Sequence, residues 1–156
     1  MDSQLSNKLY ESFPDLYRER NAPLESSKMG WGFQCGDGWY KIIYEMSKRI
    51  KKSSPEGEYA TAITQVSKNE DGTLHVEARN LTPPVADAIS AAREKSRLTC
   101  ELCSYSPAFR RTHSGPGEGL IACGRCSKSA NGGKPRTATT RPQKPRRAAD
   151  VHVVKR

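Results

Sequence analysis

The sequence predicts an α+β fold, in which a small domain of helices around a hairpin precedes a four-cysteine zinc ribbon and a disordered basic tail. Apolar residues recur at helical spacing on both sides of an alternating, strand-like segment. Two Cys-x2-Cys pairs follow, and basic residues are concentrated after them. These observations divide the chain into residues 1–99, 100–126 and 127–156.

The first third of the chain carries the apolar spacing of helices. Residues 2–19 predict two short helical pieces interrupted by Pro14, and residues 38–52 predict a longer amphipathic helix. Asp37 precedes that longer helix and is expected to cap it, because its carboxylate can accept the free N–H groups of the first turn. The apolar face of the longer helix comprises Trp39, Ile42, Ile43, Met46 and Ile50.

A hairpin and another helix are predicted before the cysteines. Residues 59–66 are rich in β-forming side chains, and residues 74–79 alternate apolar with polar side chains, as a half-buried strand does. The Asp71-Gly72 step between them favours a tight turn. A threonine and two prolines at positions 82–84 predict a hydroxyl-capped helix start.

The two cysteine pairs, Cys100-x2-Cys103 and Cys123-x2-Cys126, are separated by 19 residues. Each pair can present two thiolates to one ion, and two pairs complete the tetrahedral shell of a structural zinc. With four protein ligands, no position remains open for a reactive water. We therefore expect one structural Zn²⁺ ion.

Other uses of four thiols are weaker interpretations. Two disulfides would need an oxidising compartment, whereas the chain begins Met-Asp-Ser-Gln without a basic-then-apolar leader. A thioredoxin-type site needs only one pair and a β-α-β pattern. His113, between the pairs, could in principle replace one thiol. Without a leader or an apolar run of about 20 residues, we expect a soluble cytoplasmic protein with no membrane contact.

The composition around the second pair favours a zinc ribbon. Residues 104–122 have the glycine, proline and serine content of a hairpin with a mobile tip. Residues after Cys126 show no apolar periodicity, so no helix is expected to follow it. A treble-clef site would have such a helix, and the ribbon is therefore preferred.

The positive charge belongs to the predicted tail. Residues 127–156 hold nine Lys or Arg and one acid, a net charge of +8 in a chain of +9. Such a segment buries too little apolar surface to fold alone, and its cations can bind phosphates without reading sequence. The alternative is a solubilising tail that binds any polyanion weakly. The predicted nucleic-acid contacts are Arg110, Arg111, Arg125, Lys128, Lys134, Arg136, Arg141, Lys144, Arg146 and Arg147.

Residues 29–40 read Met-Gly-Trp-Gly-Phe-Gln-Cys-Gly-Asp-Gly-Trp-Tyr, and residues 11–17 read Glu-Ser-Phe-Pro-Asp-Leu-Tyr. With the helix, hairpin, helix and cysteine pairs that follow, the chain resembles, over roughly residues 10–126, an uncharacterised family of small bacteriophage and prophage zinc-ribbon proteins. The resemblance implies a phage origin, a bacterial host cell and a zinc ribbon, but no reaction. Similar proteins carry a hairpin rich in lysine, glycine and aromatics where this chain has residues 66–76, and the basic tail looks like an addition.

The sequence offers no catalytic constellation, and we expect no enzyme activity. Cys35 is the only thiol outside the pairs and, among aromatic residues, is expected to be a buried small side chain. His75, His113 and His152 are scattered along the chain. An HNH-type nuclease would need an Asp-His or His-His dipeptide between the cysteine pairs, and residues 104–122 contain neither.

An interaction protein is the competing functional class. A ribbon exposing Tyr105, Phe109 and Leu120 would offer a rigid platform to a host nucleic-acid-handling machine, such as RNA polymerase, a nuclease or a defence complex. The sequence leaves DNA or RNA, the host partner and the oligomeric state open.

Overall fold

The computed structural model describes residues 1–54, 57–111 and 119–130. Two antiparallel two-stranded sheets are present among these residues, one from β1 (Ala62–Lys68) and β2 (Leu74–Arg79), the other from β3 (Phe109–Arg111) and β4 (Leu120–Ala122). The α-helices are α1 (Ser3–Ser12), α2 (Tyr40–Ser53), α3 (Pro83–Arg97) and α4 (Gly124–Ala130). Short 3-10 helices are η1 (Arg18–Asn21), η2 (Lys28–Trp31), η3 (Asp37–Trp39) and η4 (Gly57–Tyr59). The predicted α+β class is confirmed.

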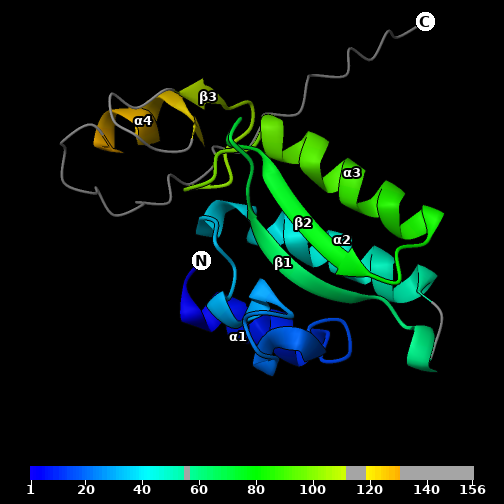
Figure 1. The fold of residues 1–156 in the computed structure, drawn as a ribbon. Helices are drawn as coiled ribbons and strands as arrows, with labels where there is room; N and C mark the ends of the chain where they lie inside the picture. The colour runs from blue at the N-terminus through cyan, green and yellow to red at the C-terminus, as the bar shows by residue number, and fades with distance from the viewer. Residues whose placement is uncertain (55–56, 112–118, 131–156) are drawn as a thin grey trace, which may run out of the picture.

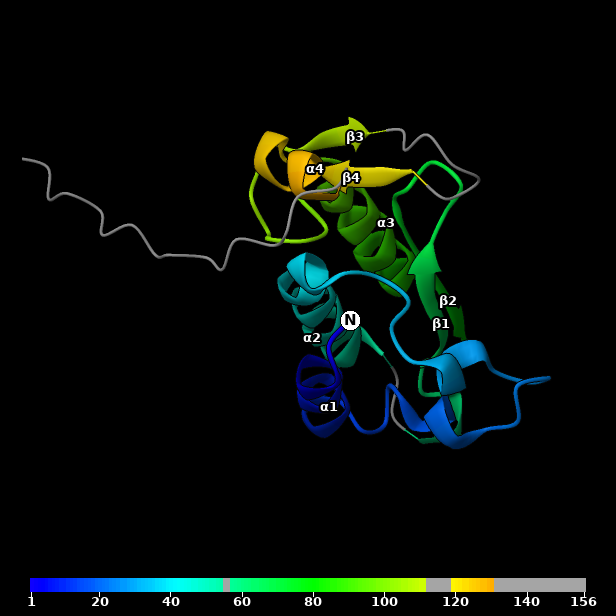
Figure 2. The ribbon, with the colours of Figure 1, turned by 90° about the vertical axis from the view of Figure 1, so that its left-hand side faces the viewer.

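Helices α2 and α3 lie side by side against the β1–β2 hairpin (Figure 1). Figure 2 shows the hairpin at one side of the molecule, with α1, α2 and α3 on the other side of it. The β3–β4 hairpin and α4 lie together at the end of α3. This smaller unit, residues 100–130, contains all four paired cysteines.

The core forms because the apolar residues of α2 recur on one face. Ile42, Ile43, Met46 and Ile50 are buried as predicted, and Trp39 just before the helix is completely buried. Burial of a large apolar side chain stabilises a fold by roughly 1.5–3 kcal/mol, so this face anchors the domain. The same cluster of buried residues continues into Cys100, Ile121 and Cys123.

The start of α2 differs from the predicted one. Helix α2 begins at Tyr40, after the 3-10 turn η3, and no side chain caps it. The Asp37 carboxylate instead accepts the Asp2 backbone N–H at 2.6 Å. Asp37 therefore ties the N-terminal segment to this turn, and the predicted cap is wrong.

The start of α3 is at the predicted place but lacks the predicted cap. Thr82 precedes the helix, and Pro83 and Pro84 occupy its first positions. Neither proline has an N–H to donate, and within the described part of the chain the buried Thr82 hydroxyl has no hydrogen-bond partner. Fixed proline dihedrals, and not a hydroxyl cap, mark this helix start.

Strand β2 covers the predicted residues 74–79, while β1 begins three residues later than predicted because η4 intervenes. Gly72 supplies the turn between them with a φ of +79°. Residues 33 and 34 run beside β1, where the Gln34 N–H donates to the Val66 carbonyl at 3.0 Å. The segment of residues 29–40 therefore lies against the hairpin.

The expectation of no helix after the second cysteine pair is wrong. Helix α4 begins at Gly124 and runs to Ala130, past the predicted boundary at residue 126. It has no apolar stripe for a periodicity argument to find, and its first turn is held by the Ser127 N–H bond to the Cys123 carbonyl at 3.0 Å. The absence of such a helix was the reason to prefer a ribbon over a treble-clef site, and α4 removes that reason.

Candidate metal centre

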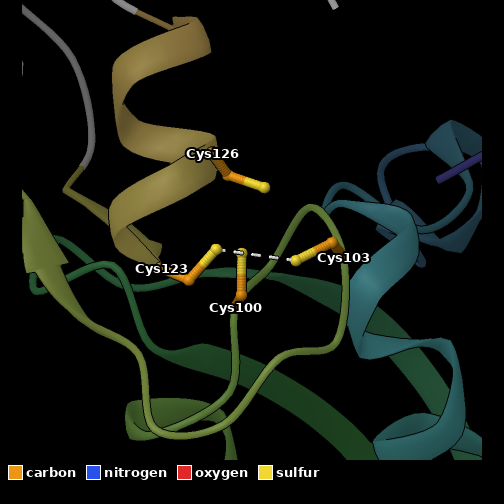
Figure 3. Close-up of side chains that lie close together, drawn as sticks. All are labelled: Cys100, Cys103, Cys123 and Cys126. Atoms are coloured by element: carbon orange, nitrogen blue, oxygen red, sulfur yellow. Dashed lines mark hydrogen bonds between the residues drawn. The ribbon is translucent and has the colours of Figure 1, made fainter. Parts of the chain in front are cut away.

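The four paired cysteines converge on one point (Figure 3). Their sulfur atoms all lie within 4.8 Å of one another, and the Sγ atoms of Cys103 and Cys123 are 3.7 Å apart. We call Cys100, Cys103, Cys123 and Cys126 the four-cysteine cluster. Within the described ranges it is the group of Cys, His, Asp or Glu side chains that could hold a metal ion.

The spacing of the sulfur atoms fits tetrahedral coordination. Metal–sulfur bonds of about 2.3 Å in a tetrahedron place sulfur atoms about 3.8 Å apart. The 3.7 Å separation of Cys103 and Cys123 has this value. All five cysteines of the chain are free thiols, so no disulfide competes for these ligands. The four-cysteine cluster can therefore hold one metal ion.

The first pair of ligands lies in a tight turn that we call the first knuckle, residues 100–104. The Cys100 N–H donates to the Tyr105 carbonyl at 2.8 Å, and the Ser104 N–H donates to the Cys100 carbonyl at 3.0 Å. Ser104 adopts a φ of +62°, which reverses the chain directly after Cys103. These bonds bring the two thiols of the pair to the same side.

The second pair is positioned by β4 and α4. Cys123 lies between the strand and the helix, and Cys126 lies in the first turn of α4. Burial raises the pKa of the Cys123 thiol, but hydrogen bonds from the backbone N–H groups of Cys126 and Arg125 and from neighbouring thiols outweigh burial and lower that pKa to about 7. Cys123 is therefore prepared to act as a thiolate ligand.

Two other thiols of the cluster retain their protons more strongly. Burial raises the pKa of Cys103, and burial together with hydrogen bonds to Cys103 and Cys123 raises that of Cys126. Four adjacent thiolates repel one another unless a cation neutralises them. A metal ion bound here would displace these protons.

Residues that the sequence analysis did not single out support the first knuckle. Glu101 is 4% exposed, and its carboxylate lies 3.4 Å from the Lys68 ammonium. The same carboxylate accepts the Gly36 N–H at 2.9 Å, and the Glu101 carbonyl accepts the Gly38 N–H at 2.7 Å. No local motif reveals these contacts, because Glu101 lies 33 positions from Lys68 and 65 positions from Gly36 in the sequence.

The predicted nucleic-acid residues fall into three groups. Arg125 and Lys128 are exposed on α4. Arg110 and Arg111 belong to β3, where the description covers the backbone alone. The others lie outside the described residues: Lys134, Arg136, Arg141, Lys144, Arg146 and Arg147.

The proposed interaction platform is partly wrong. Tyr105 is exposed, as expected, but Leu120 is only 9% exposed because β4 packs into the core. The side chain of Phe109 and all of His113 lie outside the description. Two leucines near Tyr105 that the sequence analysis did not select, Leu98 and Leu102, are exposed.

Cys35 is not part of the cluster. Its thiol is 6% exposed in the core, and burial is the main cause that raises its pKa to about 12. The expectation of a buried small side chain is confirmed. Trp39 and Phe33 nearby are buried too, whereas Trp31 is 56% exposed.

No protein family, curated protein or solved structure matches this chain. Within the described ranges, no helix has the length and apolar character needed to cross a membrane.

Proposed function

We propose that the four-cysteine cluster holds one structural Zn²⁺ ion. Four sulfur ligands within 4.8 Å of one another suit zinc, which has no redox chemistry and accepts an all-sulfur shell. With four protein ligands, the ion would fix the fold of residues 100–130 and leave no coordination position for a substrate. The role is non-catalytic.

We further propose that the protein binds nucleic acid through phosphate contacts. The observation that carries this proposal is the exposure of Arg125 and Lys128 on α4, the helix that also supplies the ligand Cys126. A metal-fixed helix holds these two cations in place, and the basic segment after it adds a large positive charge. Contacts of this kind bind phosphate without reading base sequence.

The setting that we propose is a bacterial cell infected by, or carrying, a phage. Support for it comes from the motif of residues 29–40 followed by the helix, hairpin and cysteine pairs in the order described above. DNA and RNA both fit the phosphate chemistry.

The salt dependence of binding tests this function. Fluorescence anisotropy of labelled duplex and single-stranded oligonucleotides, from about 50 to about 200 mM salt, gives the slope of log affinity against log salt. Replacing Arg125 and Lys128 by Gln in the full chain should reduce the steepness of this slope on duplex DNA by up to about 1.8, or about 0.9 for each lost phosphate contact. Replacing Lys134, Arg136, Arg141, Lys144, Arg146 and Arg147 by Gln should reduce it further.

The matched control changes the same charge elsewhere. Lys51 and Lys52 are exposed in the last turn of α2, at the opposite end of that helix from Tyr40. The double Lys→Gln variant at these positions should leave the slope unchanged. If the α2 and α4 variants reduce the salt slope equally, net charge alone attracts the polyanion. That result would contradict a specific phosphate contact on α4.

A protein partner is the second candidate, and one specific observation favours it. Leu98, Leu102 and Tyr105 are 53%, 45% and 59% exposed within and beside the first knuckle. Exposed apolar side chains on a rigid turn are suited to a protein interface. Binding to a host nucleic-acid-handling complex by this route would survive high salt and would be lost on Leu102→Ser and Tyr105→Ser replacement.

A further inference from the structure

Residues 36–39, which we call the docking segment, lie against the backbone of the first knuckle. The Gly38 N–H donates to the Glu101 carbonyl at 2.7 Å, and the Ser104 hydroxyl donates to the Gly38 carbonyl at 2.8 Å. The Trp39 indole N–H donates to the Thr99 carbonyl at 2.8 Å. One short segment thus bonds to the residues on both sides of the first two metal ligands.

The contact is close enough to require glycine. A Cβ atom on Gly38 would lie 2.2 Å from the Cys100 carbonyl oxygen, and one on Gly36 would lie 2.4 Å from the Glu101 carbonyl oxygen. Both neighbours are backbone atoms that cannot move without moving the knuckle. Neither glycine has a positive φ, so close approach and not backbone conformation explains the residue type.

The docking segment is itself held by the core. Trp39 is completely buried, and the Cys35 side chain just before the segment is 6% exposed. Through the Glu101 carboxylate the knuckle also reaches Lys68 at the end of β1. The first knuckle is therefore fixed from outside the cysteine pairs, by a segment more than 60 residues away in the sequence.

We infer that the docking segment positions Cys100 and Cys103 for metal binding, so that metal affinity depends on residues 36–39 as well as on the cysteines. This inference rests on the metal site of the proposed function and goes beyond it. Groups that orient metal ligands typically change metal affinity by about 10–100-fold when they are replaced. Because coupling is reciprocal, the bound metal also stabilises the docking segment.

Two serines provide a mild and closely matched test. Ser104 directly follows Cys103 and bonds to Gly38, whereas Ser127 directly follows Cys126 and bonds to Gly124 within its own helix, at 3.3 Å. Ser104→Ala should weaken zinc binding about 3- to 10-fold, the effect of one lost hydrogen bond. Ser127→Ala should leave zinc affinity within about 2-fold of the unaltered protein. Competition with a chromophoric chelator measures both.

Two glycines provide a stronger test. Gly38→Ala should weaken zinc binding by about 10-fold or more. Gly124→Ala is the control, because Gly124 lies between two ligands but has open space around its Cβ position. Gly32→Ala separates docking from general destabilisation. The φ of +72° at this position would strain an alanine, yet the added Cβ would meet only the Tyr10 hydroxyl, at 3.7 Å. This variant should lower thermal stability while zinc affinity is retained.

The outcomes distinguish failure of the metal site from failure of the docking role. If the unaltered protein binds no zinc, the metal proposal fails. If the unaltered protein binds zinc and Ser104→Ala binds as tightly as Ser127→Ala, the docking role fails while the metal site stands. A loss in Gly32→Ala equal to that in Gly38→Ala would also overturn the docking role. Should Gly38→Ala not fold, the serine pair decides.

Discussion

Cys35 and the four-cysteine cluster place the same side chain in opposite environments. The Cys35 thiol is enclosed by the core, and its pKa is raised from the ordinary 9.0 to about 12, chiefly by burial. Cys123 has hydrogen bonds from backbone N–H groups at the start of α4, and its pKa is lowered to about 7. The environment of each thiol thus separates a packing role from a metal-binding role.

This difference predicts the order in which thiols react. Because burial raises the pKa of the Cys35 thiol to about 12, this thiol stays protonated at about pH 8, so a thiol reagent should not label it in the folded protein. If the metal ion holds residues 100–130 folded, chelation should unfold them and leave four solvent-exposed, fast-reacting thiols. Cys35 should react only after denaturant is added. The number of reactive thiols is measured from the coloured thiolate that each one releases from a chromophoric disulfide reagent. Cys35→Ala should keep four fast thiols, and a fast count of five in the unaltered chain would contradict the buried assignment.

The sign of the pH effect follows from the raised pKa of Cys35. Its neutral form is favoured in the folded state, so the stability it supports is complete below about pH 9 and is lost as the pH rises toward about 12. Sequence alone indicated that Cys35 is buried among aromatic residues. The opposite effect at Cys123 depends on the helix α4, which the sequence did not reveal.

At the scale of elements, the β1–β2 turn meets the segment before β4. A Cβ atom on Gly72 would lie 2.2 Å from the Gly119 carbonyl oxygen. The β1–β2 turn therefore packs closely against the backbone that leads into β4. The Asp71-Gly72 step predicts the turn, but this packing contact is a property of the folded chain.

Alanine at two glycines separates the contact from backbone strain. Gly57 and Gly72 have nearly equal φ values of +81° and +79°, but Gly57 has nothing within 4 Å of its Cβ position. We expect Gly57→Ala to destabilise the fold by about 1–2 kcal/mol through strain alone. Gly72→Ala should destabilise it by about 1–3 kcal/mol more, because the added atom also overlaps Gly119. Urea unfolding of both variants measures the difference in the free energy of unfolding. Equal destabilisation by the two replacements would contradict a close contact between Gly72 and Gly119.

The elements also show which sequence signals predict structure. Strand β2 follows from strict alternation, and α2 follows from a continuous apolar face. Helix α4 was missed because its first turn is organised around Cys123 and Cys126, so no apolar stripe exists to be found. A cysteine pair placed directly after a strand is the signal that could have indicated it.

At the scale of the whole molecule, residues 100–130 share one buried core with the helices and the hairpin that precede them. The docking segment contacts the first knuckle, Gly72 contacts Gly119, and the Lys68 ammonium lies 3.4 Å from the Glu101 carboxylate. The cysteine ligands were predictable from their spacing. The docking contact was not, because no local pattern specifies which distant backbone a glycine approaches.

We propose above that residues 100–130, together with the basic residues that follow them, act on nucleic acid. The most direct measurement is a pull-down of the tagged full-length protein from bacterial lysate, with and without exhaustive nuclease treatment, followed by identification of what remains bound. We predict that nucleic acid is retained without nuclease and that the captured material is lost with it. A single host complex that stays bound in stoichiometric amount after nuclease would contradict this claim and favour the exposed residues around the first knuckle as a protein-binding surface.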